Sequence, residues 1–228
     1  MTMTDTPTPS ASPEPEAAAT APRGRRQQAK PGPRAPRKVH PVLEKLFTLY
    51  PGLFGARFLP LKRGIFQELL AAHPEAFAKD ELKVALALHT RSTRYLEAVA
   101  SGRQRHDLQG QAVEPVAPEH VHHAILEVFK RQQTRGAQDA RPQALKRIAA
   151  AIDGSGLSPQ DYGALVRGQD ETANALLDEA LADAGARSAK AEALLRAFTA
   201  SGKSETEFAD MYGMEPEEVA QTLARARR

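Results

Sequence analysis

From residue 41 onward, the apolar residues recur at intervals of three and four, the spacing of one face of an α-helix. Val42, Leu46 and Phe47 begin this pattern, and residues 61–73, 79–89, 90–99 and 118–129 continue it. Only residues 103–116 have the pattern of a small hairpin, which turns at Gln109–Gly110. The spacing therefore predicts a mainly α fold that contains one two-stranded ribbon.

Several classes of protein are excluded by composition. The 228 residues include no cysteine, which excludes a disulfide scaffold, a Cys-ligated zinc site, an iron–sulfur cluster and a thiol nucleophile. No apolar run is long enough to span a bilayer, and the first thirty residues lack the apolar core of a signal peptide, so we expect a cytoplasmic location.

Motifs that carry catalysis are missing as well. The chain has no GxSxG, no P-loop, no GxGxxG after a strand and no HExxH, and its carboxylates are scattered rather than paired. His120 and His123 share a helix face beside His122, but no third ligand is placed to complete a metal site. We therefore predict a protein that is not an enzyme and that holds no metal and no cofactor.

Charge and proline divide the chain into segments. Residues 1–39 carry seven Lys or Arg against three Asp or Glu, with eight prolines, which predicts a disordered basic arm. Such an arm is either a solvated tail or a nonspecific contact for a polyanion. Residues 40–135 form the expected first domain and are mildly basic, residues 136–142 are an expected linker, and residues 143–228 are an expected acidic helical module.

Positive charge in the first domain lies at positions that suit a phosphate backbone. Lys79 and Lys83 are four residues apart on one helix face, and the segment 90–95 combines hydroxyl residues, two arginines and a tyrosine at a helix start. A helix N-terminus with free N–H groups binds phosphate, and Tyr and Arg contact ribose, base or phosphate. The alternative is a solvated charged face with Tyr95 in the core.

Residues 40–135 resemble the ProQ/FinO domain of bacterial RNA chaperones. The resemblance rests on four segments in order: Pro60–Leu69 (PLKRGIFQEL), Leu82–Thr90 (LKVALALHT), Arg94–Leu96 (RYL) and Arg105–Gly110 (RHDLQG). It implies binding of structured RNA, namely terminator-like hairpins and their 3′ tails in small RNAs and mRNAs, in post-transcriptional regulation. Together, the resemblance and the charge pattern nominate as RNA-binding residues Lys62, Arg63, Lys79, Lys83, Thr90, Arg91, Ser92, Arg94, Tyr95, Arg103 and Arg105.

Three positions depart from the family pattern. Arg63 replaces an apolar residue, which implies either an extra phosphate contact or a more exposed position. His89 replaces what is often a tyrosine and adds pH sensitivity if it contacts RNA. Thr93 stands where some members have an aromatic residue. We expect these departures to affect which RNAs are preferred more than whether RNA is bound.

The C-terminal segment contains two similar stretches 46 residues apart. Ser155–Tyr162 (SGLSPQDY) recurs as Ser201–Phe208 (SGKSETEF), and each copy has the pattern of three helices. The similarity is either a tandem repeat of three-helix units or a coincidence among Ala-rich helices. The last two helices have the pattern of a helix-turn-helix. The carboxylates of Glu215, Glu217 and Glu218 open the second of them and would repel DNA phosphates, which argues against DNA binding.

Three functions remain open at this level. The RNA chaperone is the first. The second is a protein-interaction adaptor that uses the helical module, through a protein partner or self-association. The third is a DNA-binding regulator that uses the last two helices.

Overall fold

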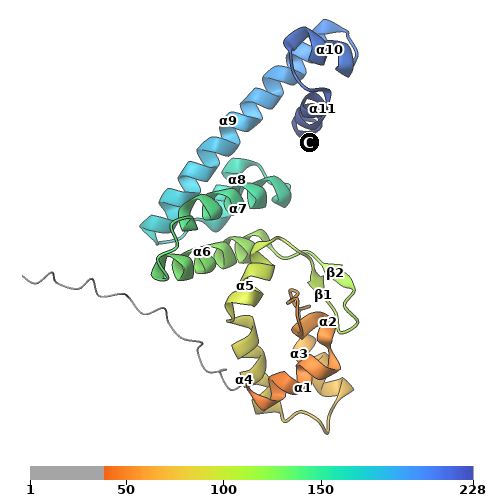
Figure 1. The fold of residues 1–228 in the computed structure, drawn as a ribbon, viewed down its shortest axis with the longest axis vertical. Coiled ribbons are helices and arrows are strands. Elements are labelled where there is room, and N and C mark those ends of the chain that lie inside the picture. The colour runs from red at the N-terminus through yellow and green to blue at the C-terminus, as the bar shows by residue number, and fades with distance from the viewer. Residues whose placement is uncertain (1–38, 228) are drawn as a thin grey trace, which may run out of the picture. The chain divides into compact units, whose positions relative to one another are not determined.

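The computed structural model describes residues 39–227, so nearly all of the expected basic arm lies outside the described residues. Within this range the chain forms eleven α-helices and one two-stranded sheet, which confirms the expected mainly α fold (Figure 1). The elements are α1 (Pro41–Leu49), α2 (Pro51–Phe54), α3 (Ile65–Ala72), α4 (Lys79–Thr90), α5 (Thr93–Ala100), β1 (Arg105–His106), β2 (Ala112–Glu114), α6 (Pro118–Thr134), α7 (Ala140–Ser155), α8 (Pro159–Val166), α9 (Glu171–Ser201), α10 (Glu205–Tyr212) and α11 (Pro216–Ala226).

The elements of residues 39–135 follow the apolar spacing, with two differences: the helix expected from residue 61 begins only at Ile65, and one short helix is added. Pro51 follows the last residues of α1 and opens the short helix α2, because a proline suits the first turn of a helix. The predicted hairpin is present: Arg105 pairs with Glu114 in the antiparallel sheet, and Gly110 takes a φ of 76° in the turn. His106 also pairs in parallel with Leu61, which joins the hairpin to the segment before α3.

The apolar faces of α1 to α6 meet in one core. Its fully buried side chains include Leu46, Phe54, Leu69, Leu82 and Ile125, which come from five different helices. This core does not stop at the expected linker. It continues through α7 and α8 into the first half of α9, and α7 itself begins at Ala140, inside the segment expected as a linker.

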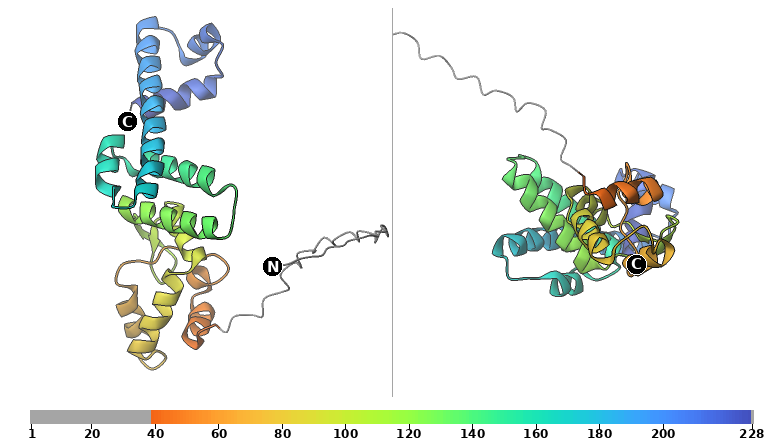
Figure 2. Two further views of the ribbon diagram at one scale, coloured as in Figure 1. Left: turned by 90° about the vertical axis from the view of Figure 1, so that its left-hand side faces the viewer. Right: turned by 90° about the horizontal axis from the view of Figure 1, so that it is seen from below.

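The two stretches with the 46-residue spacing form two matching helical units. The first consists of α7, α8 and the first half of α9; the second consists of the second half of α9, α10 and α11. Gly156 and Gly202 end the first helix of each unit with a positive φ, and Ser158 and Ser204 each cap the next helix. The third helix of one unit and the first helix of the other are thus a single helix of 31 residues, α9 (Figure 2).

The second unit has a small core of its own. Phe208, Ala209, Val219 and Leu223 are buried there, with Leu194 and Phe198 partly buried beside them. In the first unit, α8 approaches α9 so closely that a Cβ at Gly163 would lie 2.8 Å from Leu181 Cδ1. Among the described residues, no helix is both long and apolar enough to cross a membrane.

Candidate RNA-binding surface

The peptide of Leu61 is fixed from both sides by two of the nominated residues. Its N–H donates to the Tyr95 hydroxyl at 3.1 Å, and its carbonyl accepts from Arg105 Nη1 at 3.0 Å. The neighbouring backbone is tied to β1, because His106 N–H donates to the Pro60 carbonyl at 2.7 Å and Lys62 N–H donates to the His106 carbonyl at 2.9 Å. The segment before α3, the hairpin and α5 therefore form one rigid unit.

Tyr95 lies in the core rather than at the surface. Its residue is 7% exposed, and burial raises the pKa of its hydroxyl, opposed by the Leu61 N–H and by Arg105. The ring is consequently closed to stacking against a base, and the expectation of a Tyr95 platform does not fit its position. Arg105 is also largely covered, with a side chain 16% exposed.

Glu114 on β2 organises the nominated arginines near the hairpin. Its carboxylate accepts from Arg63 Nη2 at 2.7 Å and from Arg63 Nε at 3.0 Å, and it lies 3.9 Å from Arg105 Nε. The bidentate contact with Arg63 holds the pKa of Glu114 below its usual value. The Arg63 side chain nevertheless stays 80% exposed, as one reading of this departure from the family pattern implied, and this exposure leaves it accessible to a phosphate.

Lys62 has an acidic partner of the same kind. Its ammonium group lies 2.5 Å from Glu68 Oε1, and this contact raises the pKa of Lys62. The side chain is about one third exposed. Lys62 is thus a cation that is already neutralised by a neighbour but still reaches the surface.

An open cavity on the other side of α5 brings together two nominated arginines. Arg94 and Arg103 line it with Phe58, Glu97 and Ser101, and its volume is about 330 Å³. Arg94 lies over the Phe58 ring, with Cζ 6.0 Å from the ring centroid, in a cation–π contact. Both arginines are exposed, so this cavity offers guanidinium groups and an aromatic ring to a ligand.

His89 is packed beneath this cavity. Its ring lies 4.4 Å from Phe58, 4.7 Å from Phe54 and 5.2 Å from Tyr95, centroid to centroid, and the residue is 2% exposed. Burial lowers the pKa of His89 to about 4, so the ring is neutral at pH 7. The pH sensitivity of His89 therefore acts on the fold and not through a direct contact at the surface.

The turn between α4 and α5 contains the nominated hydroxyl residues. The Ser92 hydroxyl caps α5 by accepting from Tyr95 N–H at 3.2 Å, whereas the Thr90 hydroxyl donates back to the Leu86 carbonyl at 2.9 Å. Arg91 and Arg94 are exposed on either side of this helix start. Of the two hydroxyl groups, Ser92 is the one placed at the free N–H groups of α5.

Arg131 on α6 holds this turn, and sequence reasoning missed it. Arg131 Nη1 donates to the Arg91 carbonyl at 2.8 Å and to Thr93 Oγ1 at 3.2 Å. Thr93, which stands where some family members have an aromatic residue, thus serves as a hydrogen-bond acceptor. No local signal identifies Arg131, because it is one basic residue among several on α6 and its partners lie about 40 residues earlier.

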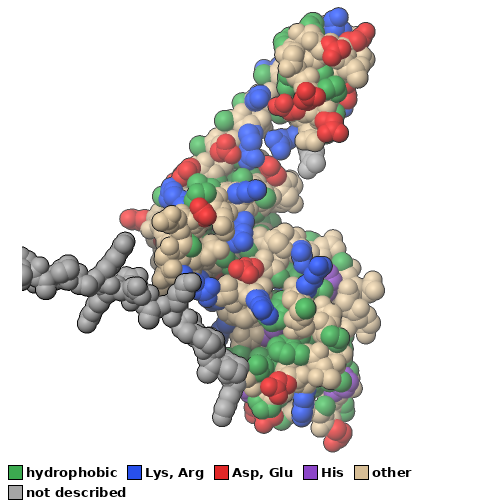
Figure 3. Space-filling view, viewed as in Figure 1, with side chains coloured by type: hydrophobic (Ala, Val, Ile, Leu, Met, Phe, Trp, Pro, Cys, Tyr) green, Lys and Arg blue, Asp and Glu red, His purple; other side chains and the backbone are tan. Residues whose placement is uncertain are grey.

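Lys79 and Lys83 are exposed in the first half of α4. They lie about 10 Å or more along the helix axis from the α5 start, at 1.5 Å per residue. The structure thus groups the nominated residues around Leu61 and Glu114, around the Phe58 cavity and around the α5 start, with the two lysines further along α4. Phe58, Glu68 and Glu114, like Arg131, are parts of this surface that sequence reasoning did not identify. Figure 3 shows Lys and Arg side chains over α5, α6 and the hairpin on the face in view.

Comparisons with known proteins agree on one family. Residues 36–141 match the family model described as the ProQ/FINO family. The chain is 36% identical over 115 residues to a curated protein of Shewanella frigidimarina (strain NCIMB 400) named RNA chaperone ProQ, a match that covers 49% of this chain and 56% of that protein. The chain thus spans about half the length of this relative.

A solved structure from Neisseria meningitidis MC58, described as a FinO-like RNA chaperone, is also similar. It is 35% identical, with a TM-score of 0.34, and the match covers 36% of this chain and 85% of that one. The family model matches the segment that contains the Leu61 contacts, the hairpin and the Phe58 cavity. Residues 36–141 of this chain therefore belong to the ProQ/FinO family.

Proposed function

We propose that this protein is an RNA chaperone that binds structured RNA through its ProQ/FinO domain. The observation that carries the proposal is the open cavity that exposed Arg94 and Arg103 line together with Phe58; Arg94 lies in the first turn of α5, whose start is capped by Ser92. Guanidinium groups and helix N–H groups bind phosphates, and an aromatic ring stacks against an unpaired base. The curated relative and the solved structure, both described as RNA chaperones, support the same function.

The proposed ligand is a terminator-like hairpin with its single-stranded 3′ tail, as found in small RNAs and at mRNA 3′ ends. The duplex places phosphates at a regular spacing, which exposed cations such as Arg63, Arg91 and Lys83 recognise by shape. The unpaired tail enters the Phe58 cavity. Binding there shields the 3′ end and shifts pairing equilibria, with no bond made or broken, so the protein acts in post-transcriptional regulation as a binder and not as an enzyme.

The test measures affinity of the full chain for a hairpin RNA with a short U-rich tail, by fluorescence anisotropy at two salt concentrations. The variants are Arg94→Ala and Arg103→Ala, because both side chains are exposed and neither holds Leu61, as Tyr95 and Arg105 do. Arg196→Ala is the matched control, since the Arg196 side chain is 81% exposed on α9.

We expect each cavity variant to weaken binding by about 1 kcal/mol, or five- to tenfold, and Arg196→Ala to leave it unchanged. A 3′-phosphate on the RNA should also weaken binding relative to a 3′-hydroxyl end. Equal affinity for the parent and both cavity variants would show that the cavity is not the RNA site. Binding that ignores the 3′ end would refute recognition of the tail.

A further inference from the structure

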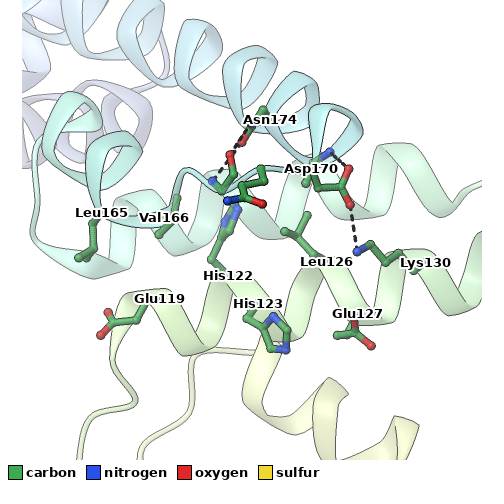
Figure 4. Close-up of a pocket in the computed structure, with 13 residues that line it drawn as sticks. Glu119, His122, His123, Leu126, Glu127, Lys130, Leu165, Val166, Asp170 and Asn174 are labelled. Atoms are coloured by element: carbon green, nitrogen blue, oxygen red, sulfur yellow. Dashed lines mark hydrogen bonds and ion pairs between the residues drawn. The ribbon is translucent and has the colours of Figure 1, made fainter.

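In the first helical unit, α6 covers one face. His122 Nδ1 on α6 lies 3.2 Å from the Tyr162 hydroxyl on α8, and Lys130 Nζ on α6 lies 3.0 Å from Asp170 at the start of α9. A cavity of about 260 Å³ between these elements is lined by α6 together with Leu165, Val166 and Ala173 (Figure 4). The first unit therefore packs this face against an amphipathic helix, α6, that carries a cation near its C-terminal end.

The second unit presents the equivalent face. At the 46-residue spacing, Leu165 corresponds to Met211 and Val166 corresponds to Tyr212, both on α10. Ile148 and Ile152 of α7 correspond to Leu194 and Phe198 in the second half of α9. The rings of Phe198, Phe208 and Tyr212 form a continuous row, with centroids 5.4 Å and 4.6 Å apart.

This second face is less covered than the first at three of its four positions. At the fourth, Met211 and its counterpart Leu165 are almost equally exposed, at 51% and 48%. Ile148 and Ile152 are 0% and 3% exposed, whereas Leu194 and Phe198 are only partly buried. Met211 and Tyr212 are 51% and 54% exposed, among the most exposed large apolar side chains of residues 39–227. We call Leu194, Phe198, Met211 and Tyr212 the α10 face. Leu194 and Phe198 pack on one side against the core of Phe208, Val219 and Leu223 but stay partly exposed, and no helix of the described residues takes the place of α6 in the second unit.

The charge around the α10 face indicates what covers it. Residues 204–226 contain six acidic residues and one basic residue, Arg225, which pairs with Asp153 of α7; Arg227 follows and pairs with Glu205, so the other five carboxylates of this range have no Lys or Arg partner within it. At the 46-residue spacing, Glu218 corresponds to Thr172, near the start of the last helix of the first unit. Thr172 lies two residues after Asp170, whose carboxylate pairs with Lys130 of α6. Figure 3 shows acidic side chains over α10 and α11, with Lys or Arg side chains beside them. A helix docked here meets carboxylates where α6 meets one.

We propose that the α10 face binds a basic amphipathic helix of a partner protein, in the way that the first unit binds α6. Apolar side chains of the partner helix cover Met211 and Tyr212, and its Lys or Arg residues pair with Glu217 and Glu218. This site is separate from the proposed RNA-binding residues, which all precede α6. An experiment can therefore refute the proposal for the α10 face without refuting the RNA-binding proposal, and the reverse.

The probe is a peptide with the sequence of residues 118–134, the α6 segment, in which Glu119→Lys and Glu127→Lys make it basic. The unmodified segment is the neutral control peptide. Binding to the full chain is measured by fluorescence anisotropy. Two variants address the α10 face, Met211→Lys and the pair Glu217→Lys with Glu218→Lys. Two others make the same change in the covered first unit, Leu165→Lys and Glu171→Lys, and serve as matched controls because Leu165 is 48% exposed.

We expect saturable binding of the basic peptide, about tenfold weaker binding of the neutral peptide, and a loss of about tenfold with either variant of the α10 face. Leu165→Lys and Glu171→Lys should leave binding unchanged. Sedimentation and thermal melting of each variant establish that it is folded and report its oligomeric state.

Three outcomes would overturn the proposal. One is no binding of the basic peptide, and another is binding that Met211→Lys leaves intact. The third is a parent protein that self-associates and that Met211→Lys converts to a monomer, because the occupant would then be a second copy of this chain.

Discussion

Lowering the pH from 8 to 5 should destabilise this protein through two buried histidines before its carboxylates titrate. His89 and His122 are 2% and 3% exposed, and burial lowers the pKa of each to about 4, with His123 nearby adding to the effect at His122. In the unfolded chain both pKa values return to about 6.5. The unfolded state therefore binds more protons than the folded state between pH 6.5 and 4, and stability falls as the pH falls through this window.

The magnitude follows from the two pKa values. For one histidine, a folded pKa of about 4 and an unfolded pKa of about 6.5 cost about 2 kcal/mol between pH 8 and pH 5. Two independent sites together cost about 4 kcal/mol, a large part of the stability of an ordinary domain. The full penalty, about 3 kcal/mol for each site, is reached only below pH 4.

The assay is urea unfolding followed by circular dichroism at pH 8, 7, 6 and 5. His89→Phe suits the site, because Phe54, Phe58 and Tyr95 surround the ring and His89 Nε2 has no hydrogen-bond partner to lose. Between pH 8 and pH 5, we expect the free energy of unfolding of this variant to fall by about 2 kcal/mol less than that of the parent.

His122→Gln should flatten the pH profile by a similar amount, although it also loses the contact with the Tyr162 hydroxyl and starts from a lower stability at pH 8. His123→Gln is the control, since His123 is exposed on the same helix and its substitution should leave the profile nearly unchanged. If His89→Phe and His122→Gln each retain the full loss of the parent, burial of the two rings does not set the pH dependence.

Two further predictions concern single contacts. Arg131→Ala should lower the free energy of unfolding by about 1–2 kcal/mol, because it removes two hydrogen bonds to the turn before α5, and should weaken RNA binding severalfold; urea unfolding and anisotropy measure the two effects, and unchanged stability would contradict a role in holding the turn. Ser204→Ala should lower the free energy of unfolding by about 1 kcal/mol, because Ser204 and Glu207 form a capping box at the start of α10; Asp210→Ala, an exposed substitution in the same helix, is the control for thermal melting.

Local features of the sequence predicted most of the secondary structure. Ser92, one of the hydroxyl residues at the predicted helix start, caps α5; Ser158 and Ser204 cap the corresponding helices of the two similar stretches, and Gly110 turns the predicted hairpin. These features depend on a few neighbouring residues, because a cap or a turn is satisfied by backbone groups within about four positions. The short helix α2 was missed, since Pro51 both ends one helix and begins the next.

The arrangement of the candidate site, by contrast, could not be predicted from local features of the sequence. Arg94 and Arg103 were predicted and are exposed, but sequence alone did not place Phe58 in the same cavity or separate exposed Arg63 from covered Arg105. A tyrosine is common both in a core and on a binding surface, so the sequence alone could not tell which of the two Tyr95 occupies. Its burial in the structure is what excludes stacking against a base. Burial depends on which distant segments pack together, which a local pattern does not record.

For the C-terminal module, the 46-residue spacing by itself determined two matching sets of caps and apolar positions. The tertiary structure alone decided that α9 serves both units and that α6 covers only the first of them. The physical reason is that an apolar helix face requires some cover but does not specify which one. Sequence therefore sets the pattern of each unit, whereas packing determines which face remains free.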